Sequence, residues 1–359
     1  MAFKPSIKTQ VLETPALIIE MDALESNIRM MSEFFKDKKA KLRPHFKTHK
    51  SPEIARMQVA AGAKGLTCAK LGEAEVLVGA GIKDILIANQ IVDKGKLNRL
   101  AGLARFAKMG VCADNADNIA DLSKAAQYYG STLHVLVEIN VGMERCGVNT
   151  KEEVKYLAKL INSSDGLVFE GFQAYAGQLS HNLDKPERVS GVGDAVAKVG
   201  AIKKYLEDDG IAVAQISGAG TGTYNITGDN TIWTEIQAGS YVFMDTDYEQ
   251  LGLDFMKSLT VLATVIHKRP GAAITDAGQK SCCITVGPPA IAGYPGLFAT
   301  LSEEHGKIID AEDLLEYQQR VEYLPSHCCT TVNLHDRYYC VRDGALEAVW
   351  NIAGRGKTQ

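Results

Sequence analysis

The sequence predicts an α/β protein: a (β/α)8 TIM-type barrel followed by a second, mainly antiparallel β domain. Its 359 residues exceed one ordinary domain and suit a barrel of about 250 residues with a smaller module. Between about residues 15 and 245, short apolar runs alternate with amphipathic stretches, which is typical of parallel strands joined by helices. Beyond about residue 250, strand-like runs separated by turns indicate the β domain.

The predicted barrel strands are short apolar runs, several of them rich in valine and isoleucine. Continuously apolar runs are typical of parallel strands that are buried on both faces. The runs are Ala16–Met21, Leu42–Lys47, Gly65–Lys70, Asp84–Gln90, Phe106–Asp114, Thr132–Asn140, Leu167–Ala176, Ala214–Gly220 and Glu235–Phe243. Alternation alone also permits an open doubly wound sheet, but eight or nine strands favour the closed barrel.

Helical patterns lie between these runs. They include Asp22–Lys39, Ser51–Ala61, Asn115–Tyr129 and Glu152–Ser163. The first has an acidic first turn and places Leu24 and Ile28 on one face. The second starts with Ser51 as N-cap and Pro52 at the first helical position, which is a common helix start.

The region after the barrel has shorter strands and more turns. Its predicted strands are Leu259–His267, Ala272–Asp276, Gln319–Tyr323, Thr330–Asn333, Tyr338–Arg342 and Glu347–Trp350. We therefore expect a barrel over residues 15–248 and a β domain over 249–359. Residues 1–14 precede the first strand, and we expect them to associate with the β domain.

Composition excludes several classes of partner. The net charge of −4 provides no basic field for nucleic acid or an anionic membrane. No run approaches the ~18 apolar residues that span a bilayer, and the N-terminus lacks the apolar core of a signal peptide. We therefore expect a cytoplasmic protein, and in that compartment its eight cysteines should be free thiols or metal ligands.

The first candidate for chemistry is Lys47, at the end of the run that begins at Leu42. Barrel enzymes carry their chemistry at the C-terminal ends of strands. A lysine that is desolvated there has a lowered pKa, which suits Schiff-base formation. On composition alone, a solvated basic loop is the simpler explanation of Arg43–Lys50.

The second candidate is the glycine-rich segment Ser217–Thr223, which follows another apolar run. Glycines allow backbone N–H groups to approach an anion, and the hydroxyls of Thr221 and Thr223 add donors. Late strand–helix loops of barrels often bind phosphate. A simple tight turn would produce the same pattern.

The third candidate is His327 with Cys329, in the β region. Alternate residues of a strand point to one face, so the two side chains could hold one metal ion. Two protein ligands would leave open positions, as catalytic metals require. A core histidine beside buried thiols is the alternative.

Many segments of the chain resemble one family, in the family's order. They are Thr14–Leu17, Arg43–Lys50, Ala69–Glu75, Gly142–Val148, Gly218–Tyr224, Gly239–Asp245, Pro325–His327 and Thr331–Leu334. Together they resemble the D-threonine aldolase and D-serine dehydratase family, whose members are metal-dependent pyridoxal phosphate (PLP) enzymes built like alanine racemase. The resemblance spans nearly the whole chain.

The resemblance implies roles for particular residues. For the cofactor these are Lys47 as its Schiff-base lysine, Arg145 against its ring, Tyr175 in its pocket, and Thr221, Gly239, Ser240 and Tyr241 around its phosphate. His327 and Cys329 would bind a divalent ion (Zn, Mn or Mg), and His181 would act as general base. The resemblance also implies a small D-amino acid substrate and a homodimer.

Two reactions are compatible with such a site. Loss of the β-hydroxyl proton leads to Cα–Cβ cleavage and gives glycine and an aldehyde. Removal of the Cα proton leads to loss of hydroxide and gives a 2-oxo acid and ammonia. The Gly-Thr-Gly-Thr-Tyr loop and the closing Trp350–Gly356 resemble aldolases, whereas Cys329 resembles the dehydratases of D-serine or 3-hydroxy-D-aspartate, since aldolases typically have aspartate there. The wider pattern favours the aldolase; a racemase and a non-catalytic PLP carrier are the remaining alternatives.

Overall fold

The structure, a computed structural model, describes residues 11–229 and 232–359. The chain forms two compact units. The barrel unit consists of Met31–Lys47, Ile54–Gly239 and Lys357–Gln359, and the β unit consists of the described residues up to Met30, Thr48–Glu53 and Ser240–Gly356. The chain passes between units directly after Lys47 and directly after Gly239, two of the predicted cofactor residues.

The barrel unit contains eight parallel strands. They are β2 (Lys41–Leu42), β3 (Leu66–Cys68), β4 (Asp84–Gln90), β5 (Lys108–Ala113), β6 (Leu133–Glu138), β7 (Leu167–Ala174), β8 (Gln215–Gly218) and β9 (Glu235–Ile236). Their order is β2-β9-β8-β7-β6-β5-β4-β3. A parallel bridge between His45 and Thr67 joins the two ends of this order, and the Phe46 N–H donates to Thr67 O at 2.7 Å. The predicted α/β barrel is confirmed.

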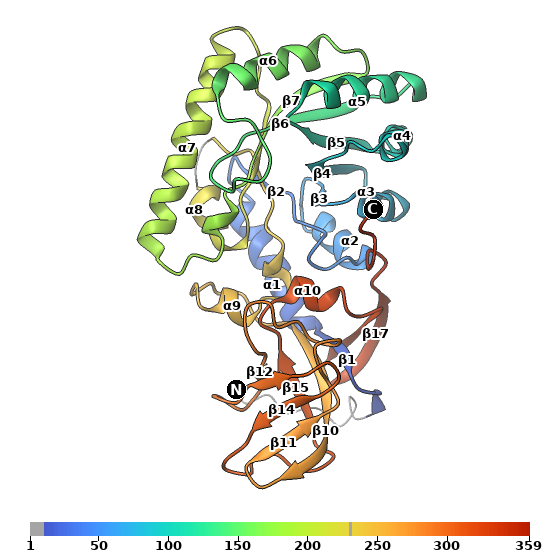
Figure 1. The fold of residues 1–359 in the computed structure, drawn as a ribbon, viewed down its shortest axis with the longest axis vertical. Coiled ribbons are helices and arrows are strands. Elements are labelled where there is room, and N and C mark those ends of the chain that lie inside the picture. The colour runs from blue at the N-terminus through green and yellow to red at the C-terminus, as the bar shows by residue number, and fades with distance from the viewer. Residues whose placement is uncertain (1–10, 230–231) are drawn as a thin grey trace. The chain divides into compact units, whose positions relative to one another are not determined.

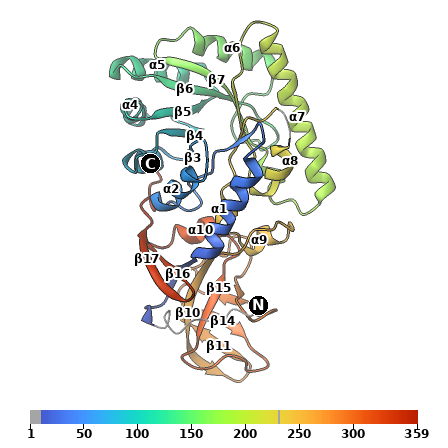
Figure 2. The same ribbon diagram turned by 180° about the vertical axis from the view of Figure 1, so that it is seen from behind.

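Helices follow these strands, as the alternating pattern predicts. They are α2 (Pro52–Ala60), α3 (Leu71–Gly79), α4 (Lys94–Leu103), α5 (Ala116–Tyr129), α6 (Lys151–Asn162), α7 (Lys185–Glu207) and α8 (Tyr224–Gly228). They lie on the outer side of the strands (Figure 1), and the reverse view shows α7 beside α8 (Figure 2). Local chemistry fixes where they begin: Asn115 accepts the N–H groups of Asp117 and Asn118, and Thr150 forms a capping box with Glu153.

The β unit is built on a nine-stranded sheet. Its strands are β1 (Ala16–Glu20), β10 (Leu259–Arg269), β11 (Ala272–Thr275), β12 (Ala290–Ile291), β13 (Ala299–Leu301), β14 (Gly306–Ile309), β15 (Arg320–Leu324), β16 (Arg337–Arg342) and β17 (Ala345–Asn351). Nearly all pairings are antiparallel; β1 with β16 is the parallel one. Helix α1 (Met21–Phe35) follows β1, and α9 (Thr246–Glu249) and α10 (Cys328–Val332) also start in this unit.

Two predicted strands are corrected by the structure. The run Ala16–Met21 is not a barrel strand, because β1 pairs with β10 and β16 in the antiparallel sheet. The run Thr330–Asn333 is not a strand either, since Thr330 to Val332 belong to α10. His327 and Cys329 therefore do not lie on one face of a strand. The start of helix α10 sets their relative positions instead.

The segment before β1 contacts the β unit, in the part of it that is described. Leu12 packs in a cluster with Leu262 and Val341, and the Thr14 hydroxyl lies 2.6 Å from that of Thr264 on β10. The rest of the predicted association falls on residues 1–10, outside the described residues. None of the eight cysteines, all of which lie in the described ranges, forms a disulfide. No helix in the described ranges is long and apolar enough to cross a membrane.

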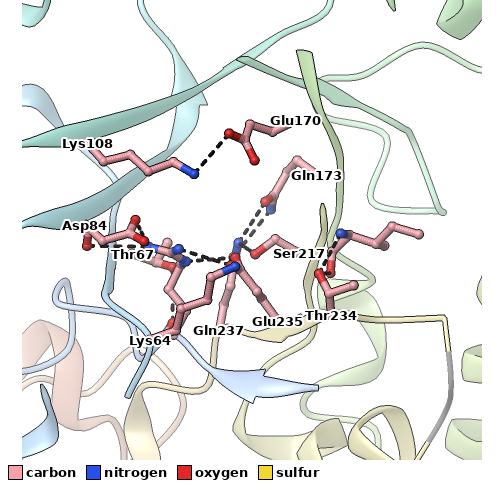
Figure 3. A network of polar contacts seen from close by, with 12 residues as sticks. Lys64, Thr67, Asp84, Lys108, Glu170, Gln173, Ser217, Thr234, Glu235 and Gln237 are labelled. Carbon is pink, nitrogen blue, oxygen red and sulfur yellow. Dashed lines mark hydrogen bonds and ion pairs between the residues drawn. The ribbon is translucent and has the colours of Figure 1, made fainter. Parts of the chain in front are cut away.

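A buried ionic network connects strands of the barrel. The Arg43 guanidinium, 1% exposed, donates through Nε to Glu235 Oε2 (2.8 Å) and through Nη1 to Asp84 Oδ1 (2.8 Å). Lys64 Nζ adds a 2.6 Å contact to Glu235, whose carboxylate is fully buried. Figure 3 shows Lys64, Asp84 and Glu235 within this polar network. Because Arg43 reaches both β4 and β9, it ties together strands on either side of the point where the ring closes.

Amides continue the polar interior beyond the ionic network. Gln237 Nε2 donates to Gln173 Oε1 (2.7 Å) and to Ser217 Oγ (2.8 Å), and all three residues are buried (Figure 3). Burial strengthens such bonds and makes unpaired groups costly. These bonds link β7, β8 and the segment after β9.

Glu322 on β15 should make stability depend on pH. It is 3% exposed, and burial raises its pKa from 4.5 to about 7, against the opposing hydrogen bond from Thr260. A carboxyl with a raised folded-state pKa stabilises the fold below its unfolded pKa, and this contribution is lost as the pH rises through 7. The free energy of unfolding of Glu322→Gln, taken relative to that of wild type, should therefore increase by roughly 3 kcal/mol from pH 5 to pH 8.5.

Urea unfolding at the two pH values measures this effect. Glu312→Gln, at an exposed carboxylate of the same unit, is the matched control and should follow wild type at both. A difference between Glu322→Gln and wild type that does not change with pH would contradict the assignment.

Candidate active site

Lys47 follows β2 at its C-terminal end, where barrel enzymes place their chemistry. Every residue from Leu42 to Lys50 is buried except Lys47, which is exposed. Its backbone N–H lies 3.4 Å from Nδ1 of His45, itself paired with Thr67. The surrounding chain is therefore fixed while the amine remains accessible, as a residue that binds a ligand covalently requires.

Arg145 is on the loop between β6 and α6, which is shaped by its own backbone contacts. Asn140 Oδ1 accepts the Gly142 and Glu144 N–H groups at 3.0 and 3.3 Å. Gly147 has φ +97°, and a Cβ there would lie 2.7 Å from Asn140 N, so only glycine fits. These contacts shape the loop that carries Arg145.

Tyr175, just after β7, is the centre of a small cluster. The Arg145 guanidinium lies 5.7 Å from the centroid of its ring. Its hydroxyl is 3.4 Å from Ser180 Oγ, and a Cβ on Gly220 would lie 3.6 Å from that hydroxyl. His181 directly follows Ser180 and is exposed. The structure therefore brings Arg145, Tyr175 and the glycine-rich segment together, with His181 beside them in the chain.

The glycine-rich segment forms a 3-10 turn, Thr221–Thr223, after β8. Thr221 and Thr223 are each 2% exposed, and the Gly220 N–H lies 3.4 Å from Thr223 Oγ1. Gly239 ends the next barrel segment. The turn is a compact run of backbone N–H groups and hydroxyls, which is suited to an anion.

Ser240 and Tyr241 begin the β unit and lie in a second 3-10 turn, Ser240–Val242. Tyr241 is fully buried, and its ring centroid lies 5.6 Å from that of Phe255. Its ring therefore has a packing role in the β unit, whereas Ser240 contacts Cys329, as described below.

Three polar side chains at the ends of β4, β5 and β6 were not among the predicted site residues. Gln90 Nε2 donates to Glu138 Oε2 (2.5 Å) and Asp114 Oδ2 (3.2 Å), and Asp114 also accepts the Gly147 N–H at 2.8 Å. Burial raises the pKa of the Glu138 carboxyl, and the Gln90 bond opposes the shift. Their signal in the sequence was a polar residue at or near the end of each predicted run: Gln90 and Asp114 close two of them, and Glu138 lies two residues before the end of the third.

The metal pair lies at the start of α10, in the β unit. His327 is the N-cap and Cys329 the second helical residue, which replaces the expected strand geometry. Cys329 Sγ lies 3.3 Å from Thr48 Oγ1 and 3.6 Å from Ser240 Oγ. A short helix start, rather than alternation along a strand, brings these groups together.

Asp245 supports this helix start and was also missed. Its fully buried carboxylate accepts the Cys328 N–H at 3.0 Å and lies 3.7 Å from His327 Nδ1. Carboxylates that contact metal-binding histidines commonly fix the ring orientation. Asp245 also accepts the Tyr248 N–H at 2.9 Å, and so caps α9.

The Cys329 thiol and the His327 imidazole shift each other's pKa in opposite directions. A hydrogen bond from Cys328, followed by the bond and charge of His327, holds the pKa of Cys329 well below its ordinary value despite burial. Burial alone would lower the pKa of His327, but Cys329 and Asp245 raise it to about 9. Thiolate is the form that binds metals. In the described ranges, no three His, Cys, Asp or Glu side chains are grouped to hold an ion, so any metal here would have two such protein ligands.

Comparison with known families covers both parts of the chain. Residues 19–247 match the alanine racemase N-terminal domain, and residues 258–341 match the serine dehydratase domain. This combination on one chain decides the family. The chain belongs to the D-threonine aldolase and D-serine dehydratase family. Members are PLP enzymes of the alanine racemase fold, and the resemblance found in the sequence is confirmed.

Individual members of the D-threonine aldolase and D-serine dehydratase family match over nearly the full length. The D-threonine aldolase of Arthrobacter sp. is 41% identical over 96% of this chain and 93% of its own. The 3-hydroxy-D-aspartate aldolase of Paracoccus denitrificans (strain Pd 1222) is 37% identical over 98% and 95%. The crystal structure of D-threonine aldolase from Filomicrobium marinum has a TM-score of 0.95 and 38% identity, covering 99% of both chains.

A dehydratase of the same family is also similar. The D-threo-3-hydroxyaspartate dehydratase from Delftia sp. HT23 has a TM-score of 0.86 and 26% identity, covering 96% of this chain and 99% of that chain. A cysteine-to-alanine variant of a D-threo-3-hydroxyaspartate dehydratase was solved in a metal-free form. As an enzyme of this family, the chain is more similar to these aldolases than to this dehydratase.

Proposed function

We propose that this enzyme is a PLP- and divalent-metal-dependent lyase that cleaves the Cα–Cβ bond of D-β-hydroxy-α-amino acids, giving glycine and an aldehyde. The observation that carries the proposal is Lys47, an exposed amine in an otherwise buried segment at the end of a barrel strand. The full-length similarity to aldolases of D-threonine and 3-hydroxy-D-aspartate supports the reaction type.

The residues of the barrel unit fit a phosphorylated pyridine cofactor. Lys47 would hold PLP covalently, and Arg145, whose guanidinium lies beside the Tyr175 ring, would lie against the ring of the cofactor. Thr221 and Gly239 would hold the phosphate, together with Ser240 and the backbone of Tyr241, which follow Gly239 directly in the chain. A Cβ on Gly220 would reach to within 3.0 Å of Ser180 Oγ, so glycine keeps this space open.

His327 and Cys329 fit a divalent metal with open coordination positions. The low pKa of Cys329 supplies a thiolate, and the nearby Asp245 carboxylate orients His327. An imidazole with a thiolate favours a softer ion such as Zn²⁺ over Mn²⁺ or Mg²⁺. Lewis-acid polarisation of the substrate's β-hydroxyl is the chemistry that such an ion supplies.

The side chains then have separate tasks. PLP supplies an electron sink for the carbanion that forms at Cα. His181 accepts the proton of the β-hydroxyl, so that the oxygen's electrons form the aldehyde as the Cα–Cβ bond breaks. Arg145 and Tyr175 keep the aromatic ligand in one orientation, and the tight turn at Thr221 anchors its anionic end.

The second candidate is a dehydratase of D-serine or 3-hydroxy-D-aspartate, which the thiolate ligand Cys329 favours. In that reaction Lys47 would remove the Cα proton, and hydroxide would leave from Cβ. The similarity to a dehydratase from Delftia, and the metal-free form of a dehydratase variant that lacks a cysteine, make Cys329 relevant to this choice.

Product analysis distinguishes the two reactions. Holoenzyme incubated with D-threonine, D-serine and 3-hydroxy-D-aspartate in defined Zn²⁺, Mn²⁺ or Mg²⁺ should release glycine and the matching aldehyde. Release of ammonia with a 2-oxo acid would favour the dehydratase. Conversion between D and L forms without either product would indicate a racemase, and a coloured protein without turnover would indicate a PLP carrier. Light scattering tests the homodimer that the resemblance implies.

Replacing His327 tests the metal pair. His327→Ala should lower turnover by about 100-fold or more, because a remaining single protein ligand holds a divalent ion weakly. PLP content, measured by absorbance after alkali release, should stay close to wild type. His267→Ala is the control, since this histidine is exposed on β10 of the same unit. Equal losses of PLP and activity would instead assign His327 a structural role.

A further inference from the structure

The segment Ile352–Gly356, here called the closing segment, is attached to the turn that follows α10. The Ile352 N–H donates to Asp336 O at 2.8 Å, and the Arg355 guanidinium pairs with the Asp336 carboxylate at 3.0 Å. Ile352 is 3% exposed. The closing segment is therefore fixed to the chain that leaves the helix carrying Cys329.

The same segment holds Lys50 through two reciprocal hydrogen bonds. The Gly354 N–H donates to Lys50 O at 2.9 Å, and Lys50 Nζ donates to Gly354 O at 3.2 Å. Lys50 is only 8% exposed, although lysine is rarely buried. Both its backbone and its side chain are thus engaged by a single glycine of the closing segment.

The backbone at Lys50 needs this support. Its φ is +51°, in the left-handed region that non-glycine residues rarely adopt. Such conformations persist when the surroundings over-determine them, and they often occur at functional sites. One residue earlier, the buried hydroxyl of Tyr338 donates to His49 O at 2.6 Å. Two neighbouring carbonyls are therefore clamped in a strained turn.

The hydrogen bonds at Lys50 connect two segments that carry residues of the proposed active site. Lys47 is three residues before Lys50, and Thr48, whose hydroxyl contacts Cys329 Sγ at 3.3 Å, is two residues before it. On the other side, the closing segment holds the turn after α10. It therefore contacts the chain that carries each partner of the Thr48–Cys329 contact.

We propose that the closing segment is a brace, and that Lys50 is a positioning residue: by holding Lys50 and the turn after α10, it fixes the residues adjoining Lys47 and the Thr48–Cys329 contact. The inference rests on the proposed function for its catalytic consequence. Small displacements at a catalytic group lower the rate strongly, so a support of this kind should matter without touching substrate. The aldolase-like motif Trp350–Gly356 then has a physical role.

The test compares Lys50→Met, which keeps the apolar stem and loses the donor, with wild-type holoenzyme. Amide hydrogen exchange in residues 48–53 should become about 10-fold faster, because the local opening is eased. The PLP dissociation constant should rise and kcat should fall by about 10-fold, with KM changing less. Tyr338→Phe, which removes only the hydroxyl from a buried ring, should shift the same measurements in the same direction.

Lys83→Met is the matched control. Lys83 Nζ also donates to a backbone carbonyl, that of Phe106 at 3.4 Å, but it precedes β4 at the opposite end of the barrel strands. Exchange and kinetics of this variant should match wild type. The proposal is overturned if amide exchange in residues 48–53 of both Lys50→Met and Tyr338→Phe matches that of wild type. It is also overturned if amide exchange in β6 rises as much as in residues 48–53. A wild-type protein that stays colourless with PLP would contradict the proposed function. Amide hydrogen exchange in residues 48–53 would still test whether the closing segment holds Lys50.

Discussion

Replacing Lys47 with alanine is expected to remove the visible absorption band of the PLP-loaded protein. The amine of Lys47 is the exposed group of an otherwise buried segment, so no adjoining side chain of that segment can form the same covalent bond. Turnover of D-β-hydroxy amino acids should fall by more than about 1,000-fold, because removal of a covalent catalytic group typically has effects of this size. Spectra of the reconstituted variant and coupled assays for glycine and aldehyde measure the two effects.

Lys124→Ala is the control for this substitution. Lys124 is an exposed residue of α5, paired with Asp121, and its loss should change neither colour nor turnover. The folded content of Lys47→Ala, measured by circular dichroism, should match wild type because the side chain contributes no core packing. A Lys47→Ala protein that retains the wild-type band would refute the assignment.

Replacing Glu235 with glutamine should destabilise the barrel by about 3–5 kcal/mol, because it leaves a buried guanidinium without its main counter-ion. The Glu235 carboxylate is fully buried, and it contacts both Arg43 and Lys64. Burial by itself would raise its pKa, but the charge and hydrogen bonds of Arg43 keep that pKa below its ordinary value. Urea unfolding at pH 7, with the loss of helical circular dichroism as signal, measures the free energy of unfolding.

An exposed pair of the same chemistry provides the control. Arg99 binds Glu75 through Nε at 2.7 Å, with side chains 46% and 35% exposed, and Glu75→Gln should cost less than about 1 kcal/mol. The double variant Arg43→Met with Glu235→Leu should recover part of the loss, since no buried charge then lacks its partner. Equal effects of Glu235→Gln and Glu75→Gln would contradict the role assigned to the network.

The lowered pKa of Glu235 also gives the sign of its pH dependence. A carboxylate with a depressed folded-state pKa stabilises the fold above its unfolded pKa, and the contribution is lost as the pH falls through the folded value. Glu322, whose folded pKa is raised, acts in the opposite sense. Glu235 therefore contributes stability at higher pH, whereas Glu322 contributes stability at lower pH.

The sequence alone determined the barrel and most of its helices. Eight buried strands must be continuously apolar, and side chains such as Asn115 and Thr150 fix helix starts through local hydrogen bonds. Lys47 was a candidate from its place at a strand end, but its cofactor role came from the family resemblance. These features depend on residues that are close together in the sequence, so they can be predicted without knowing which distant segments contact them.

Only the tertiary structure decided what depends on distant partners. An apolar run shows that β1 is buried on both faces, but not that β10 and β16, rather than barrel strands, cover its edges. The β-branched residues Thr330, Thr331 and Val332 favour a strand locally, yet Asp245 binds the Cys328 N–H and supports a helix start there. Thr48, Asp245 and the closing segment gained their roles through contacts between segments as much as 300 residues apart in sequence, which no local pattern encodes.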